Sequence, residues 1–242
     1  MRLETPDRVD VAVIGAGQAG LALGYYLAEA GVDFRLLEAA SKVGASWARR
    51  WDSLRLFTPA QYNSLPGFAF PGDPWKYPGK DEVAAYLAMY AERYALPVHL
   101  DTRVTKLNGA AGDFRLHFAS GEPLKARAVV VATGAFGSPF VPALANRLDP
   151  QVLQIHSEEY RNPSQLRGED IAVVGGGNSG FQIALELANN GMRVSLSEGV
   201  RLRNLPQRIL GVVGHEVVGA GGAMRKRTDS RPQDGNRQRT TC

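Results

Sequence analysis

The chain has 242 residues, of which 44% are hydrophobic and 21% charged, so it has the composition of a globular protein with room for one full domain and part of a second. Its single cysteine, Cys242, excludes a disulfide framework, a Cys-x-x-Cys redox pair and a cysteine-rich zinc site. The net charge is +4, and the excess lies in Arg225 to Cys242, with six Lys and Arg against two Asp.

The charge distribution and the N-terminus bear on partners and location. Outside the basic tail the charges balance at 22 of each sign, so we expect no basic surface for nucleic acid. Met1 to Asp10 is charged and lacks the apolar core of a signal peptide. The longest apolar run, Ala128 to Ala132, is far too short to cross a bilayer. We expect a cytoplasmic protein without a membrane partner; the sequence indicates no oligomeric state.

The first predicted unit is a strand, a glycine turn, a helix and a second strand. Val9 to Ile14 is a short apolar run typical of a buried parallel strand, and Gly15 to Gly20 follows it. Ala19 to Ala30 predicts a helix that Gly31 would end. Phe34 to Leu37 predicts the next strand, with Glu38 at its end.

Each glycine of this turn has a physical reason to be there. Gly15 permits a tight turn, Gly17 lets the backbone approach a pyrophosphate, and Gly20 lets the helix pack on the sheet. The helix N-terminus offers unpaired N–H groups to phosphates, and the carboxylate at the second strand end can bind an adenosine ribose. The alternative is a structural glycine turn beside an exposed glutamate. The candidate dinucleotide-binding residues are Gly15, Gly17, Gln18, Ala19, Gly20 and Glu38.

The middle of the chain carries aromatic residues and further elements. Residues 41–79 predict an ordered loop region, and Lys80 to Tyr94 predicts a helix with Asp81 as a plausible N-cap. Phe114 to Phe118 alternates as in a hairpin strand. Most of the aromatic residues between 47 and 75 are expected to be core, although they could line a substrate cavity: Trp47, Trp51, Phe57, Phe68, Phe70 and Trp75.

A second unit repeats the first. After a Pro-rich linker at residues 138–169, Ile171 to Val174 predicts a strand, Gly175 to Gly180 a glycine turn and Phe181 to Asn190 a helix. Arg193 to Ser197 predicts the following strand. Two such units in one chain are an internal repeat.

Further segments occur in an order that resembles flavin-containing monooxygenases. Gly24 extends the first glycine pattern as in FAD-binding versions of this fold. The other segments that resemble this family are Gly44-Ala45-Ser46-Trp47, Trp51 to Leu56, Tyr77 to Gly79 and Ala132-Thr133-Gly134. The resemblance covers about residues 8 to 210.

The resemblance implies an α/β fold with two Rossmann-like parts. A doubly wound FAD-binding domain, incomplete, is expected at residues 1–165, and the beginning of an NAD(P)-binding domain at 166–210. An aberrant, disordered tail is expected at 211–242. Because family members continue well past this length, we expect an N-terminal fragment whose family-like sequence ends near Gly211.

The resemblance also implies cofactor-binding residues. For FAD it adds Gly44, Ser46, Trp47, Thr133 and Gly134, and for NADP it gives Gly175, Gly177, Asn178, Ser179 and Gly180. Arg201 and Arg203 could bind the 2′-phosphate of NADPH, because a guanidinium matches that dianion. Glu198, however, stands at the position equivalent to Glu38 and would favour NAD, so both nucleotides remain open.

The implied activity is that of an FAD- and NAD(P)H-dependent monooxygenase. A nicotinamide would reduce FAD, and a C4a-peroxyflavin formed with O₂ would insert one oxygen atom into a small organic substrate. His156 and Tyr160 match half of the family's linker fingerprint, although they could equally be a surface histidine and a packed tyrosine. No catalytic side chain is evident, and the four histidines show no metal-ligand spacing. The alternative is a catalytically inactive truncated remnant that at most binds a nucleotide.

Overall fold

The computed structural model describes residues 8–199, which divide into two compact units between residues 165 and 166. Each unit has a sheet of its own. Arg201, Arg203 and the tail expected at 211–242 lie outside the described residues. The assignment of the two units to FAD and NAD(P) stays a prediction.

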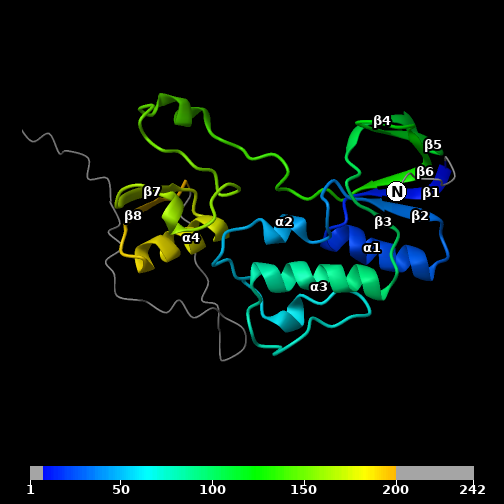
Figure 1. Cartoon of the computed structure of the whole chain (residues 1–242), viewed down its shortest axis with the longest axis horizontal. Coiled ribbons are helices and arrows are strands. Elements are labelled where there is room, and N and C mark those ends of the chain that lie inside the picture. Colours follow the sequence, from blue (N-terminus) through cyan, green and yellow to red (C-terminus); the bar gives the residue numbers. More distant parts are fainter. Residues whose placement is uncertain (1–7, 200–242) are drawn as a thin grey trace, which may run out of the picture. The chain divides into compact units, whose positions relative to one another are not determined.

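The first unit is built on a six-stranded sheet in the order β3-β2-β1-β6-β5-β4 (Figure 1). The strands β1, β2, β3 and β6 are parallel, and β5 and β4 continue from β6 as an antiparallel meander. The apolar runs of the sequence form the parallel centre, where such runs can be buried. The strands are β1 (Arg8–Ile14), β2 (Phe34–Leu37), β3 (Val98–His99), β4 (Val104–Ala110), β5 (Asp113–Phe118) and β6 (Leu124–Val131).

Helices pack on one face of the parallel centre of this sheet, and side chains of β5 pack with those of β1 and β2 on the other face. The helices α1 (Gln18–Glu29) and α3 (Lys80–Arg93) lie side by side on the first face (Figure 1). There, Leu21, Leu36 and Tyr90 belong to one buried cluster, whereas Leu116 of β5 belongs to a second cluster on the opposite face. The Rossmann-like α/β architecture expected from the sequence is confirmed, with the meander as the antiparallel continuation of the sheet.

The helix α3 begins one residue earlier than its predicted cap. Gly79 is the N-cap, and its N–H group donates to Glu82 Oε2 at 2.9 Å. This hydrogen bond lowers the pKa of the Glu82 carboxyl, with Lys76 adding to the effect. The prediction of Asp81 as N-cap was wrong, because the helix already begins at Lys80 and Glu82 binds the N–H group of the N-cap. Asp81 instead lies in the first turn, where its charge suits the helix dipole.

Tyrosine hydroxyls of α3 order the loop region at 41–79. The Tyr86 hydroxyl accepts the N–H of Leu65 at 2.6 Å and donates to the Phe68 carbonyl at 2.7 Å. Tyr90 donates to the Pro66 carbonyl at 2.7 Å. The aromatic residues of this region divide, since Trp51 and Phe70 are buried but Phe57 and Trp75 are both 54% exposed. The region also contains α2 (Ala45–Ala48) and the 3-10 helix η1 (Ala60–Tyr62).

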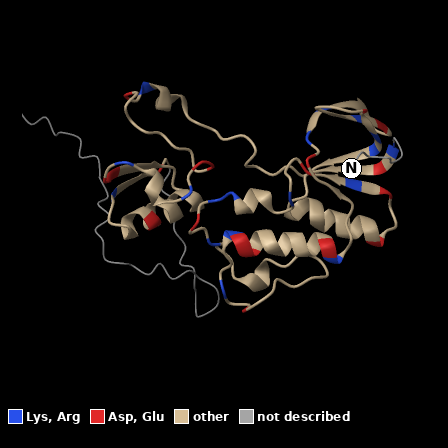
Figure 2. Ribbon diagram, viewed as in Figure 1, with Lys and Arg blue, Asp and Glu red and all other residues tan. Residues whose placement is uncertain are grey.

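The second unit is a strand, helix, strand repeat. β7 (Asp170–Val174) and β8 (Arg193–Ser197) pair in parallel, and α4 (Asn178–Asn189) packs on them through Ile183, Ala184 and Leu187. Two 3-10 helices, η2 (Ala143–Arg147) and η3 (Pro163–Gln165), lie in the linker before it. Lys, Arg, Asp and Glu are scattered over both units (Figure 2).

Candidate functional site

Two glycines of the first turn are required by the fold. Gly15 has φ +106°, and a Cβ there would lie 2.5 Å from the Ala132 carbonyl oxygen. A Cβ on Gly20 would lie 2.0 Å from the Gly15 carbonyl oxygen. Both distances are shorter than any real contact of a Cβ atom, so the turn and the approach of α1 to the sheet need glycine at these positions.

Gly17 is different, because the fold does not require it to be glycine. It is the N-cap of α1 with φ −78° and ψ −172°, a conformation open to any residue, and a Cβ there would meet nothing within 4 Å. No side chain caps this helix end. The turn therefore leaves open space beside unpaired N–H groups at a positive helix end, which suits a phosphate group.

Glu38 is held against this turn by its own carboxylate. Its Oε2 accepts the N–H of Ala16 and its Oε1 accepts the N–H of Ala40, each at 2.9 Å. The preceding residue, Leu37, is the register partner of Ile14, so Glu38 lies where β1 and β2 both end. A carboxylate has about four acceptor sites, so Glu38 keeps capacity to accept ribose hydroxyl groups.

The loop around α2 contacts the first turn through a tryptophan. Trp47 Nε1 donates to Gln18 Oε1 at 3.3 Å, which joins two predicted cofactor residues that are 29 positions apart. Ser46 is exposed nearby in α2. Gly44 has φ +79°, and a Cβ there would lie 2.6 Å from the Ala84 carbonyl oxygen. Its glycine is therefore needed for packing on α3.

The end of β6 completes this edge of the sheet. Ala132 N–H donates to the Ile14 carbonyl at 2.8 Å, and a Cβ on Gly15 would lie 3.3 Å from Thr133 Cα. Thr133 and Gly134 are exposed, and so is Ala19 in the first turn of α1. The carboxyl ends of β1, β2 and β6 thus bring most of the predicted FAD-binding residues together. Their contact with a cofactor stays a prediction.

The second turn repeats the geometry of the first. Gly175 has φ +118°, and a Cβ on Gly180 would lie 1.9 Å from the Gly175 carbonyl oxygen. Gly177, the N-cap of α4, has nothing within 4 Å of a built Cβ. Asn178 and Ser179 begin α4, with Asn178 exposed. The second turn therefore has the same open space at a helix N-terminus.

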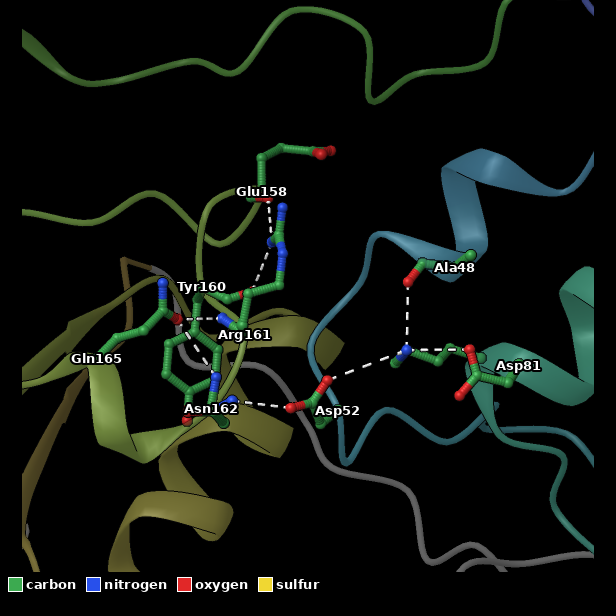
Figure 3. Close-up of polar contacts among 9 residues, drawn as sticks. Ala48, Asp52, Asp81, Glu158, Tyr160, Arg161, Asn162 and Gln165 are labelled. Atoms are coloured by element: carbon green, nitrogen blue, oxygen red, sulfur yellow. Dashed lines mark hydrogen bonds and ion pairs between the residues drawn. The ribbon is translucent and has the colours of Figure 1, made fainter. Parts of the chain in front are cut away.

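A network in the linker was not predicted from the sequence. Asp52 N–H donates to the Arg161 carbonyl at 2.7 Å, and Asn162 Nδ2 donates to Asp52 Oδ2 at 2.8 Å (Figure 3). Arg50 pairs with Glu158 at 2.7 Å, and its side chain is only 11% exposed. These contacts fix residues 158–162 to the loop after α2. No short-range pattern indicates them, because the partners are more than 100 positions apart.

The tyrosine of the linker fingerprint, Tyr160, is buried. Tyr160 is 3% exposed, and the His156 ring accepts the N–H of Glu158 through Nδ1 at 3.1 Å. These are local structural contacts of the linker. A role of either residue in chemistry stays a prediction.

Two other kinds of feature, a metal site and a membrane-spanning helix, are absent from the described residues. Between residues 8 and 199, no group of three or more His, Cys, Asp or Glu side chains could bind a metal ion. None of the helices in the same range is long and apolar enough to cross a membrane.

Comparison with curated proteins gives the chain a family. Residues 12–204 match the family described as pyridine nucleotide-disulphide oxidoreductase. The chain is 46% identical over 203 residues to an uncharacterized CzcO-like oxidoreductase of Geobacillus kaustophilus, covering 84% of this chain and 58% of that protein. It is 32% identical over 203 residues to the indole-3-pyruvate monooxygenase YUCCA1 of Oryza sativa subsp. japonica, covering 83% and 50%. The chain thus spans between 50% and 58% of the length of these relatives.

Solved structures give the same result. The fold is similar to that of a flavin-containing monooxygenase from Stenotrophomonas maltophilia, with a TM-score of 0.74 and 38% identity over 80% of this chain and 58% of that one. The family match and this structural similarity agree with the two glycine turns, in which the fold does not require Gly17 and Gly177 to be glycine. The chain belongs to the pyridine nucleotide-disulphide oxidoreductase family and, within it, to the flavin-containing monooxygenase-like proteins.

Proposed function

We propose that this chain supplies the FAD-binding part, and part of the NAD(P)H-binding part, of a flavin-dependent monooxygenase. The observation that carries the proposal is the contrast among the glycines of each turn. Gly15 and Gly20 are required by the fold, whereas Gly17 is not, and Gly177 repeats this in the second turn. At the start of a helix that directly follows a parallel strand, a glycine that the fold does not require suits a ligand that approaches the backbone.

The residues present fit the two nucleotides. In the first turn, the N–H groups at the start of α1 would hold the pyrophosphate of FAD, and Glu38 would accept hydrogen bonds from its ribose. In the second turn, the start of α4 would hold the pyrophosphate of NADPH or NADH. A steroid monooxygenase bound to NADP, 27% identical with a TM-score of 0.60, supports a nicotinamide nucleotide.

Bound FAD would supply the redox chemistry, and the protein would supply position and electrostatics. Overall, one NAD(P)H, one proton and one O₂ would yield NAD(P)⁺, water and a substrate carrying one added oxygen atom. The monooxygenases among the relatives support a small organic substrate and O₂ as partners. The flavin route of oxygen transfer expected from the sequence and a cytoplasmic location belong to the same proposal. Dithiol chemistry is disfavoured, since Cys242 is the only cysteine.

A second candidate is a chain that binds a nucleotide without turnover. Apolar side chains at two strand ends favour it, because a fully packed enzyme is expected to bury such residues. Val131 at the end of β6 is 65% exposed, and Val174 at the end of β7 is 76% exposed. Among the described residues, the second unit has a sheet of two strands, and sheets of that size are marginal by themselves.

The visible spectrum of the purified chain separates the two candidates. The chain is mixed with FAD, freed of unbound cofactor, and then given NADPH or NADH under air. The monooxygenase proposal predicts a bound yellow flavin that either nucleotide bleaches or that catalyses nucleotide oxidation. A bound flavin that neither nucleotide changes supports the binding-only chain. A colourless protein contradicts the proposed function.

A further inference from the structure

The two glycine turns are equivalent by hydrogen bonding as well as by sequence. In the first unit, Gly15 N–H donates to the Leu37 carbonyl at 2.8 Å. In the second unit, Gly175 N–H donates to the Ser197 carbonyl at 2.9 Å. The residue after each of these carbonyls is a glutamate. Glu198 is therefore the geometric equivalent of Glu38 within its own unit.

The Glu198 side chain lies on the second turn. A Cβ built on Gly176 would lie 2.7 Å from Glu198 Cγ and 3.4 Å from its carboxyl carbon. In the first turn the equivalent residue is Ala16, whose N–H binds the Glu38 carboxylate. Both carboxylates thus lie beside the second residue of their glycine turn, at the edge where two parallel strands end.

The positive charges of the described second unit lie at the opposite edge. Between residues 166 and 199, the cationic side chains are Arg167 and Arg193. Arg193 begins β8 and forms ion pairs with Asp170 at 2.6 Å and Glu169 at 3.0 Å. Arg167 precedes β7. Neither arginine is at the end of β8 where Glu198 lies.

A carboxylate at this position selects between two nucleotides. It can accept hydrogen bonds from the 2′-hydroxyl of an adenosine ribose, but it repels a 2′-phosphate at the same place. We propose that Glu198 accepts a hydrogen bond from a free 2′-hydroxyl, so that the chain binds NADH more tightly than NADPH. This proposal rests on the proposed function of the second turn.

The test compares ADP-ribose with 2′-phospho-ADP-ribose, which differ at this position and cannot reduce a flavin. Each is titrated calorimetrically into the FAD-saturated full chain, and binding lost in Gly177→Ala is assigned to the second turn. ADP-ribose is expected to bind at least about tenfold more tightly. Glu198→Gln is expected to bring the two affinities within about threefold of each other. Glu169→Gln, at the other edge of the same unit, is the matched control and is expected to keep the preference.

Three results would overturn the proposal. The first is equal or tighter binding of 2′-phospho-ADP-ribose to the parent chain, and tighter binding would assign the selection to Arg201 and Arg203 instead. The second is a preference that Glu198→Gln leaves unchanged. The third is an absence of any binding that depends on Gly177. The flavin spectrum reports separately on the first turn, so loss of FAD binding and loss of nucleotide selection are distinguishable.

Discussion

Replacing Gly17 with alanine should weaken FAD binding without unfolding the protein. A methyl group at this position meets nothing within 4 Å, and the backbone has φ −78°. Alanine is a poorer N-cap than glycine, which costs up to about 1 kcal/mol. It also restricts the unfolded chain, which offsets this cost by about 0.4–1 kcal/mol. The melting temperature should therefore change by less than about 4 °C.

The same methyl group occupies the space where a pyrophosphate would approach the backbone. We expect FAD affinity to fall at least about tenfold, or about 1.4 kcal/mol, measured by flavin fluorescence titration. Gly137→Ala is the matched control, since a Cβ there also meets nothing within 4 Å. Gly20→Ala should instead unfold the unit, because its Cβ would lie 2.0 Å from a carbonyl oxygen. Unchanged FAD affinity in Gly17→Ala would contradict a pyrophosphate site at this turn.

Three further changes test the rest of the site. Glu38→Gln removes the charge that accepts two backbone N–H groups, so FAD affinity should fall about tenfold or more by fluorescence titration, whereas Glu92→Gln on α3 should leave it unchanged. Glu158→Gln leaves a guanidinium that is 11% exposed without its counter-charge. The free energy of unfolding in urea should fall by about 1–3 kcal/mol, and an unchanged midpoint would argue against a stabilising pair. Burial lowers the pKa of His99, and the Arg35 guanidinium lowers it further. The unfolded chain then takes up a proton first as the pH falls through about 6.5, so stability should decrease there, and His99→Gln should reduce that decrease.

The local elements were predictable because their signals are local. The apolar runs before Gly15 and Gly175 become β1 and β7, and the glycine spacing places α1 and α4 directly after them. The strand ends then bring Glu38 to the turn, as parallel pairing requires. Thr133 could be assigned only through the family resemblance, since the pairing of β1 with β6 brings it close to Gly15 from far along the sequence.

Contacts without a periodic signal could not be predicted. The Arg50 and Glu158 pair and the Asp52 and Asn162 bond join a loop to a distant linker, and neither segment has a repeating pattern. Gly44 was assigned to the cofactor, but the structure gives its glycine a packing reason against Ala84. A sequence motif shows that glycine is needed at a position, but it does not show whether a ligand or a neighbouring backbone segment is the reason.

If the first turn holds the ADP half of FAD, ADP must compete with FAD for the chain, and a competition titration measures this. Binding of FAD to the full chain is followed by quenching of flavin fluorescence, and riboflavin and ADP are then added separately. We expect one FAD per chain, displacement by ADP, and riboflavin affinity at least about tenfold weaker than that of FAD. Equal binding of riboflavin and FAD, or FAD binding that ADP does not displace, would contradict a site built on Gly17 and Glu38.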